Sequence, residues 1–356
     1  MDREFRIEAL TVCFTAGVAL GTLPGPSYLL AMILDTLLCL MILIPSAGRI
    51  LPVTFLLAGV LCSLTSAFGS PAAGPGLVGR LAEGSAEGVR ALIDSLPFPS
   101  SETAPILKAF LTGDRSSLPR ETTAVFRSSG ASHLLAVSGL HIGVIYLIFR
   151  RIGSIFGNFP AVRAARSLLT MAAAGFFTVM VGGSPSSVRA FLFIVISETA
   201  LLAGRKRDSL KVLCLALFLQ LAAFPEMIRS VGFQLSYAAM LGIFLLYPAM
   251  DSWYPAPERP APALSNPLRR IWQGAALSIS CQVFTAPLSW HYFHSFPRYF
   301  LLTNLLALPL TTGIIALSIA TIFLAILPFG PPELLISLTD SAVSLLLDIL
   351  ETISSM

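Results

Sequence analysis

The chain has 356 residues, of which 55% are hydrophobic and only 12% are charged, with a formal net charge of +4. Its mean hydropathy of +0.81 excludes an ordinary soluble globular protein, in which about a quarter of the residues would be charged. Long apolar runs over the whole length predict an all-α, polytopic helical membrane protein. The five cysteines lie within apolar runs without a CxxC motif, so we expect neither a disulfide framework nor a metal site.

Three hydrophobic segments open the chain, at residues 7–23, 28–44 and 50–68. Prolines in the LPGP sequence at 23–26 and at Pro45 separate them, because proline ends a helix or starts a turn. The second segment contains Asp35, which suits either a bundle interior or a nearby interface. We interpret residues 1–68 as N-terminal membrane helices, and we expect the first to be retained because no typical signal-peptide cleavage site follows it.

The character of the sequence changes over residues 69–129, where charged residues become common. GSPAAGPG at 69–76 is typical of a linker, and residues 77–96 have the apolar spacing of an amphipathic helix. A second short helix is expected over 102–111. The segment holds six basic and six acidic residues, so it is not an obvious phosphate-binding patch. We interpret 69–129 as an outer linker with amphipathic helices.

Residues 128–151, SSGASHLLAVSGLHIGVIYLIFRR, combine the length of a membrane span with side chains that do not suit lipid. About 20 residues of α-helix cross roughly 30 Å of hydrocarbon. The stretch contains Ser138, and its two histidines, His133 and His141, lie eight positions apart, which on a continuous helix places them on one face. Gly139 and Gly143 form a GxxxG pair that allows close helix packing. We therefore expect this helix inside a bundle, facing protein or a water-filled path.

Seven further helices are predicted after this stretch. Membrane segments are expected near 167–181, 188–203, 210–224, 231–247, 275–290 and 300–327, with Pro309 as a candidate break in the last. A final helix at 333–353 is expected at the interface or against the bundle. The sequence therefore predicts about ten or eleven membrane crossings. We interpret residues 130–356 as one transmembrane domain.

Basic residues alternate between the connections in a way that orients the chain. The connections on the side of the N-terminus hold most of them: Arg3, Arg6, Arg49, Arg150, Arg151, Arg163, Arg166, Arg205, Lys206, Arg207, Lys211, Arg259, Arg269 and Arg270. The short connections on the other side hold only Arg189, Arg229 and Arg298. Because basic loops stay in the cytoplasm, this pattern predicts a cytoplasmic N-terminus and places 69–129 outside.

Polar residues within the apolar segments are the candidate site residues. Arg189, in GSPSSVRAFLF, suits either a contact with lipid headgroups or a phosphate contact in a pore. Glu198 lies nine residues further on, where a buried carboxylate needs a partner or a proton. In GFQLSYAAMLG, Gln234 and Ser236 suit either pore lining or hydrogen bonds to neighbouring helix backbones.

Two chemical alternatives are disfavoured by the sequence. His291 and His294 lie three apart in WHYFH, but no carboxylate or cysteine stands nearby to complete a metal site. Ser138 and His141 lie within one helical turn, as a serine hydrolase pair would, yet no oxyanion hole or orienting third group is identifiable. The GxSG pattern of rhomboid proteases is not met, because Ala136 stands at its first glycine. We therefore expect no catalytic residue, no metal and no cofactor.

HLLAVSGLHIG, at residues 133–143, closely resembles the signature helix of the ComEC competence family, the presumed channel for one DNA strand in natural transformation. The similarity continues in order through LTGDRSSLP at 111–119, GSPSSVRAF at 183–191, GFQLSYAAMLGI at 232–243 and residues 281–310. The resemblance covers the transmembrane competence domain. It implies a multi-pass inner-membrane channel for single-stranded DNA, in which Arg189 contacts phosphates while His133, Ser138, His141, Gln234 and Ser236 line or brace the path.

The sequence also departs from full-length members of that family. These typically add an outer OB-fold domain and a β-lactamase-like nuclease domain, but residues 69–129 show no run of strands and no HxHxDH metal motif occurs. No GxxxxGK[ST] phosphate loop is present either. We therefore expect a non-enzymatic channel subunit that relies on a cytoplasmic helicase or ATPase, a separate nuclease and DNA receptor proteins. It would contact membrane lipid and is a candidate homodimer.

Two other functions stay open at this point. The first is a proton- or ion-coupled transporter of another solute, in which Glu198 is the coupling site. The second is a membrane scaffold that has lost transport. A neutral substitution at Glu198 should abolish flux in a coupled transporter, have a mild effect in a channel and have none in a scaffold.

Overall fold

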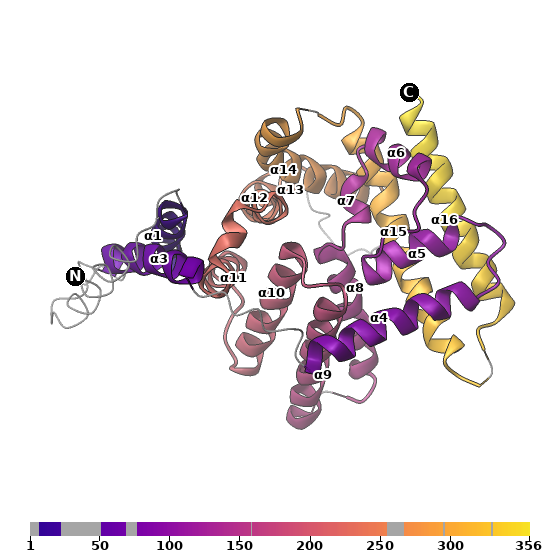
Figure 1. Ribbon diagram of the computed structural model, residues 1–356, viewed down its shortest axis with the longest axis horizontal. Coiled ribbons are helices and arrows are strands. Elements are labelled where there is room, and N and C mark those ends of the chain that lie inside the picture. Colours follow the sequence, from indigo (N-terminus) through magenta and orange to yellow (C-terminus); the bar gives the residue numbers. More distant parts are fainter. Residues whose placement is uncertain are drawn as a thin grey trace. The chain divides into compact units, whose positions relative to one another are not determined.

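The computed structural model describes residues 7–22, 51–68, 77–157, 159–254, 267–294, 296–328 and 330–356 (Figure 1). Over these residues every regular element is a helix, as the apolar composition predicts. The segment predicted at 28–44 lies outside the described residues. The protein is an all-α helical membrane protein.

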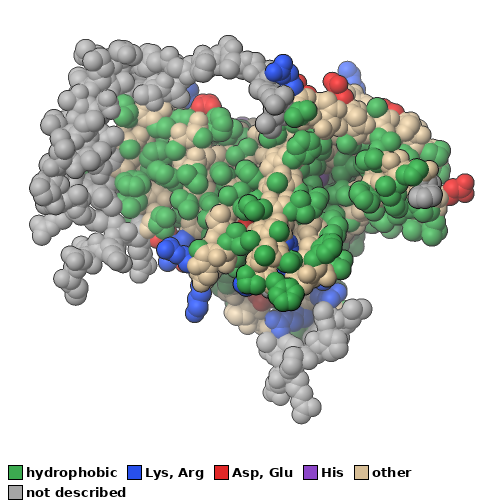
Figure 2. Space-filling model, turned by 90° about the horizontal axis from the view of Figure 1, so that it is seen from below, with side chains coloured by type: hydrophobic (Ala, Val, Ile, Leu, Met, Phe, Trp, Pro, Cys, Tyr) green, Lys and Arg blue, Asp and Glu red, His purple; other side chains and the backbone are tan. Residues whose placement is uncertain are grey.

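Two described helices are long and apolar enough to cross a membrane, judged by length and composition: α10 (Pro185–Leu202) and α15 (Phe300–Ala325). Three shorter helices are also apolar, namely α1 (Ile7–Gly21), α11 (Ser209–Ala223) and α12 (Val231–Leu245). Figure 2 shows that hydrophobic side chains dominate the face it draws, with charged side chains mostly toward its margins. The total of ten or eleven crossings stays a prediction.

Buried hydroxyl groups within the helices donate to backbone carbonyls four residues earlier. Thr178 donates to Ala174 at 2.7 Å, Ser280 to Ala276 at 2.7 Å and Ser318 to Ile314 at 2.6 Å. Such bonds satisfy a hydroxyl within its own helix. They suit a membrane interior, where water is not present to accept the hydrogen bond.

The chain divides into two compact units. One comprises Met1–Gly74 and Leu192–Tyr237, and the other comprises Pro75–Phe191 and Ala238–Met356. Two of the boundaries between the units fall inside helices, one after Phe191 in α10 and one after Tyr237 in α12. Each of these two helices therefore contributes residues to both units. The domain boundaries predicted from sequence, at 68 and 129, stay predictions.

In the first unit, α1 packs backbone to backbone on α3 (Leu51–Phe68). A Cβ atom on Gly17 would lie 1.9 Å from the carbonyl oxygen of Leu56, and one on Gly59 would lie 2.1 Å from that of Phe14. Only glycine permits this approach, as in other close membrane helix pairs. The Phe14 ring also packs against Phe218 of α11, with centroids 4.6 Å apart.

The second unit contains the remaining helices, which Figure 1 shows in purple through yellow. They are α4 (Leu77–Ser95), α5 (Thr103–Thr112), α6 (Arg120–Ser128), α7 (Ser132–Leu135), α8 (Gly139–Ser154), α9 (Pro160–Met180), α13 (Tyr247–Asp251), α14 (Pro267–Phe293), α15 and α16 (Glu333–Ser354). Their shared core draws apolar side chains from α4 through α8 and from α15 and α16, including Ile93, Phe110, Phe126, Leu134, Val144, Ile314 and Leu346.

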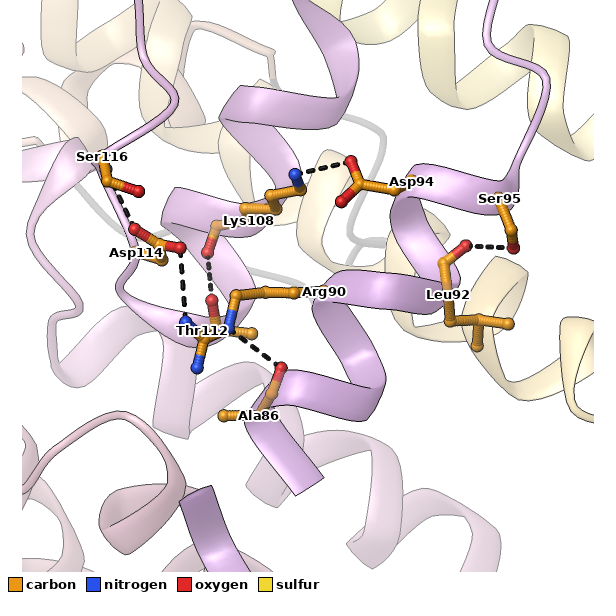
Figure 3. A network of polar contacts seen from close by, with 9 residues as sticks. All are labelled: Ala86, Arg90, Leu92, Asp94, Ser95, Lys108, Thr112, Asp114 and Ser116. Carbon is orange, nitrogen blue, oxygen red and sulfur yellow. Dashed lines mark hydrogen bonds and ion pairs between the residues drawn. The ribbon is translucent and has the colours of Figure 1, made fainter. Parts of the chain in front are cut away.

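Polar contacts fix α5 within this unit on two sides. Lys108 of α5 pairs with Asp94 of α4, and Arg90 of α4 pairs with Asp114 just after α5 at 3.4 Å (Figure 3). On the other side, a carboxylate oxygen of Asp340 in α16 accepts from the Thr103 hydroxyl at 2.6 Å and from the Ser100 backbone N–H at 3.1 Å. The helices predicted at 77–96 and 102–111 therefore join α16 around one core.

Candidate functional site

The stretch at 128–151 does not form one helix, so that prediction is wrong. Helix α7 ends at Leu135, Ala136 is extended with ψ 130°, and α8 begins only at Gly139. Ser138, between them, is also extended, with φ −117° and ψ 174°. Because the chain leaves the helical path between the two histidines, the eight-residue spacing does not place His133 and His141 on one helical face.

Ser138 and His141 together cap the start of α8. The Ser138 hydroxyl accepts from the Leu140 N–H at 3.2 Å, and the Ser138 N–H donates to Nδ1 of His141 at 3.2 Å. This reciprocal arrangement is a capping box in which histidine replaces the usual glutamate or glutamine. The Ser138 hydroxyl also lies 3.2 Å from Nδ1 of His141, so the two side chains contact each other directly at the start of α8.

The His141 ring is enclosed. The residue is fully buried, and its ring meets the Phe110 ring edge-on at 5.8 Å between centroids. Nδ1 accepts from a backbone N–H, so the neutral ring carries its proton on Nε2. Nε2 has no hydrogen-bond partner among the described residues. A buried polar group in this state is unusual and marks the position as a candidate functional one.

His133 has a different environment from His141. It lies on the short α7, is exposed to solvent, and its Nδ1 lies 3.2 Å from the Gly130 carbonyl oxygen. The structure therefore separates the two predicted histidines, one exposed before the break and one buried after it. Their proposed roles in a DNA path stay predictions.

The GSPSS sequence that starts α10 is bonded to the break before α8. The hydroxyl of Ser186 donates to the Val137 carbonyl at 2.9 Å, and that of Ser184 does so at 3.4 Å. The Ser184 hydroxyl also accepts from the Ser187 N–H at 3.3 Å, which caps the first turn of α10. Two motifs about fifty residues apart in sequence thus meet at the starts of two helices.

Arg189 lies at this junction. It is 7% exposed, and a Cβ atom on Gly139 would lie 3.2 Å from its Nη2 atom. The starts of α8 and α10 carry partial positive charge from their aligned peptide dipoles, to which the guanidinium adds a full charge. A helix start and a guanidinium are both groups that can bind an anion such as phosphate.

A third motif, LTGDRSSLP, reaches the same place. Gly113 ends α5 in the left-handed conformation, with φ +75°, and a Cβ atom on it would lie 3.4 Å from Cγ2 of Val137 and 3.7 Å from the Val181 carbonyl oxygen. The next residue, Asp114, is held by the Ser116 hydroxyl and N–H and by Arg90, which together keep the pKa of its carboxyl below the usual range. Three separate motifs thus converge around Val137.

The other predicted site residues lie in the first unit. Gln234 donates to the Ile228 carbonyl at 2.8 Å, so it braces the 3-10 turn η2 (Pro225–Arg229). Ser236 is half-buried, and Glu198 of α10 is 1% exposed. The Gln234 contact is to the turn just before its own helix and not to a neighbouring helix, so the expected bracing role also stays a prediction. The part of Gln234 in a DNA path stays a prediction.

Gly139 and Gly143 differ in their surroundings. Gly139 faces Arg189 and Ala190 of α10, whereas a Cβ atom on Gly143 would meet nothing within 4 Å among the described residues. The close approach therefore occurs at the first glycine of the pair.

Sequence reasoning missed several polar contacts that hold these elements. It did not foresee that Ser184 and Ser186 bond Val137, or that the Tyr237 hydroxyl donates to Oε1 of Gln220 at 2.9 Å. The signal for the second was available, since Gln220 is a single amide in the apolar run of α11. Such an amide needs a partner when the helix is buried.

The converging motifs are those of one protein family, whose sequence model, described as Competence, competence protein, matches residues 110–356. The chain belongs to the competence protein family. The match covers more than half of the chain and includes every predicted site residue. Family membership, together with the apolar helices, supports a membrane location and a role in competence.

Three relatives show how far the similarity extends. An uncharacterised Escherichia coli protein, YcaI, is 29% identical over 206 residues, covering 57% of this chain and 26% of that protein. ComE operon protein 3 of Bacillus subtilis is 24% identical over 257 residues, covering 68% and 30%. An uncharacterised Aquifex aeolicus protein is 33% identical over 140 residues, covering 39% and 32%. The chain thus spans about a quarter to a third of the relatives' length, and no solved structure matches it.

Proposed function

We propose that this chain is a multi-pass inner-membrane channel through which single-stranded DNA reaches the cytoplasm during natural transformation. The observation that carries the proposal is the convergence of three competence motifs around Val137, with the buried Arg189 against Gly139 at the start of α8. A phosphodiester carries one negative charge per nucleotide, and guanidinium pairs with phosphate in a planar, bidentate geometry. Arg189 is then a transient phosphate contact along the path.

Passage of a strand requires this junction to open, because Arg189 is 7% exposed in the present conformation. Among the hydrogen bonds described at the junction are two from serine hydroxyls to the Val137 carbonyl, at 2.9 Å and 3.4 Å, each contributing about 1 kcal/mol net. Bonds of this size can break and re-form reversibly. His141, whose Nε2–H has no described partner, is placed next to this junction in sequence and supplies a further donor when it opens.

The orientation and the partners belong to the same proposal. The distribution of basic residues favours a cytoplasmic N-terminus. The chain is not proposed to be an enzyme, so force comes from a cytoplasmic helicase or ATPase. A separate nuclease and DNA receptor proteins deliver the strand. The pore lies either within one chain or between the two chains of a homodimer.

The test compares transformation by linear DNA carrying a selectable marker in the parent strain, a clean deletion and the complemented deletion. The same strains receive plasmid by electroporation, which bypasses the uptake machinery. The proposal expects the deletion to lose transformation by linear DNA and to retain electroporation, with complementation restoring the first. Equal transformation of the parent and the deletion would refute it.

A second candidate function rests on Glu198, a carboxylate only 1% exposed within a candidate membrane span. In a coupled transporter such a group carries the coupling proton or ion. Glu198→Gln separates the two functions, because it abolishes coupled flux but leaves a DNA channel largely active.

A further inference from the structure

A cavity of about 320 Å³ lies at the end of α8 that is opposite to the converging motifs. Its lining comes from two helices: Leu147, Arg150, Arg151 and Ser154 of α8, and Arg166 of α9. The volume is at the lower end of the range of ligand sites, about 300–1,000 Å³. Three of its five lining residues are arginines, so the cavity is suited to an anionic group.

Neither α8 nor α9 contains an acidic residue. No acidic residue occurs between Glu121 and Glu198. Among the helices that pack against α8 and α9, α15 has no charged residue, and α4 carries three acidic residues, Glu83, Glu87 and Asp94. All three are exposed, and Asp94 pairs with Lys108. Arginines at a helix C-terminus also complement the helix dipole. The helix dipole explains why Arg150 and Arg151 lie near the end of α8. It does not explain why Arg166, on α9, lines the same cavity.

Local packing brings the three arginines together. A Cβ atom on Gly153 would lie 2.6 Å from Cγ of Arg166, so the stem of Arg166 crosses α8 where only glycine leaves room. Arg150 is positioned by Tyr146, whose hydroxyl accepts from its Nη1 at 2.9 Å and whose ring lies 5.6 Å beneath its guanidinium. Guanidinium groups positioned in this way lose little entropy when they bind a phosphate.

The surroundings of the cavity are apolar and exposed. The same segment of α8, the connection after it and the first turns of α9 present a belt of large hydrophobic side chains: Leu147, Ile152, Ile155, Phe156, Phe159, Leu168 and Leu169. In a membrane protein such side chains face acyl chains. A phosphate site bounded by lipid-facing side chains fits a phospholipid whose head group enters the cavity while its chains cover the belt.

We propose that Arg150, Arg151, Ser154 and Arg166 bind the phosphate head group of an anionic phospholipid. The site is separate from the Val137 junction and does not depend on DNA transport. Single-stranded DNA is the competing occupant, because exposed aromatic side chains also stack on bases. Lipid is favoured because the arginines line one compact cavity rather than an extended groove, and because the adjoining apolar belt is aliphatic as well as aromatic.

The test measures thermal unfolding of the purified full chain in a neutral detergent as lipid is titrated in. Phosphatidylglycerol or cardiolipin should raise the unfolding temperature at concentrations where phosphatidylcholine with the same chains does not. The triple variant R150Q/R151Q/R166Q should bind the anionic lipids at least about tenfold more weakly, since each lost charge-assisted bond is substantial. If the triple variant folds poorly, the single variant R151Q replaces it, because Arg151 is exposed and its substitution should leave the fold intact. R151Q should also bind the anionic lipids more weakly than the wild type.

A matched control is the triple variant R205Q/K206Q/R207Q, which removes three exposed basic residues elsewhere. It should keep wild-type lipid binding. Equal loss of anionic-lipid binding in both triple variants would refute a specific site, because general charge attraction would then explain the binding. Stabilisation by inorganic phosphate equal to that by lipid, or stabilisation only by a single-stranded oligonucleotide, would likewise overturn the lipid assignment.

Discussion

The backbone N–H of Ser138 donates to Nδ1 of His141 at 3.2 Å, and this bond fixes both the start of α8 and the protonation of the ring. Because a backbone N–H can only donate, Nδ1 must be the acceptor, and the neutral imidazole carries its proton on Nε2. The same Ser138 belongs to the segment that Ser184 and Ser186 reach from α10. The cap of α8 and the contacts from the start of α10 are therefore made by adjacent residues, Val137 and Ser138.

Removing the Ser138 hydroxyl should destabilise the protein. Ser138→Ala deletes an N-cap acceptor, which costs about 1 kcal/mol of unfolding free energy. Ser128→Ala is the control, since Ser128 is exposed and its hydroxyl bonds only its own helix. Denaturant titration in detergent micelles measures both. Equal unfolding free energies for the two variants would show that the hydroxyl does not cap α8.

A side chain at Gly113 should also be destabilising. Gly113→Ala places an L-residue at φ +75° at the end of α5, at a cost of about 1–2 kcal/mol. Gly84→Ala and Gly88→Ala are opposite controls within α4, where an added Cβ meets nothing within 4 Å. These should stabilise the protein by up to about 1 kcal/mol each, because alanine is the better helix former. A shift of all three variants in the same direction would contradict the role of the left-handed conformation at Gly113.

Asp340 should be the more important of two aspartates on α16. Asp340→Ala removes the acceptor of two hydrogen bonds from the α5 start and should cost about 2–4 kcal/mol. Asp340→Asn should cost less, because its amide oxygen can still accept. Asp348→Ala, at an exposed position, should change the free energy of unfolding by about 0.5 kcal/mol or less. Similar losses at both positions would contradict the anchoring role of Asp340.

The pH dependence of stability should report on Asp114. Its hydrogen bonds with Ser116, and then Arg90, hold the pKa of the folded carboxyl below that of the unfolded chain. The contribution is therefore present above the unfolded pKa, near 4, and is lost as the pH falls through the folded pKa. Asp114→Asn should thus destabilise the protein at pH 7 and have a smaller effect near pH 3. In the Ser116→Ala background this difference should shrink, whereas an unchanged difference would contradict the assigned cause.

Much of the helical framework could be predicted from apolar periodicity, because membrane spans are long and compositionally distinct. The segments expected at 188–203 and 210–224 are observed as α10 at 185–202 and α11 at 209–223. The candidate break at Pro309 does not occur, since α15 runs through it. Likewise α14 continues through Pro287 and extends beyond both ends of the predicted 275–290 segment. Propensity alone cannot decide such positions when neighbouring helices support the chain.

The sequence indicates which residues are unusual, but not their local geometry. Arg189, Ser138, His141 and Gly139 are polar or small residues in apolar runs, and the structure places Gly139 against Arg189 and Ser138 against His141. Their function stays a prediction. The helix break before Ser138 was missed because a capping box is recognised by glutamate or glutamine at its fourth position, and here that position is His141. The bonds from Ser184 and Ser186 depend on tertiary structure, which a local pattern does not contain.

The most direct test of the central claim follows a fluorescently labelled strand of linear double-stranded DNA into cells. If this chain is the DNA channel, labelled DNA should stop outside the inner membrane in a clean deletion and reach the cytoplasm again on complementation. With equal amounts of protein in the membrane, Arg189→Ala should resemble the deletion, Arg189→Lys should retain partial delivery, and Glu198→Gln should be close to wild type. Delivery to the cytoplasm at the parental rate without this chain would contradict the channel function.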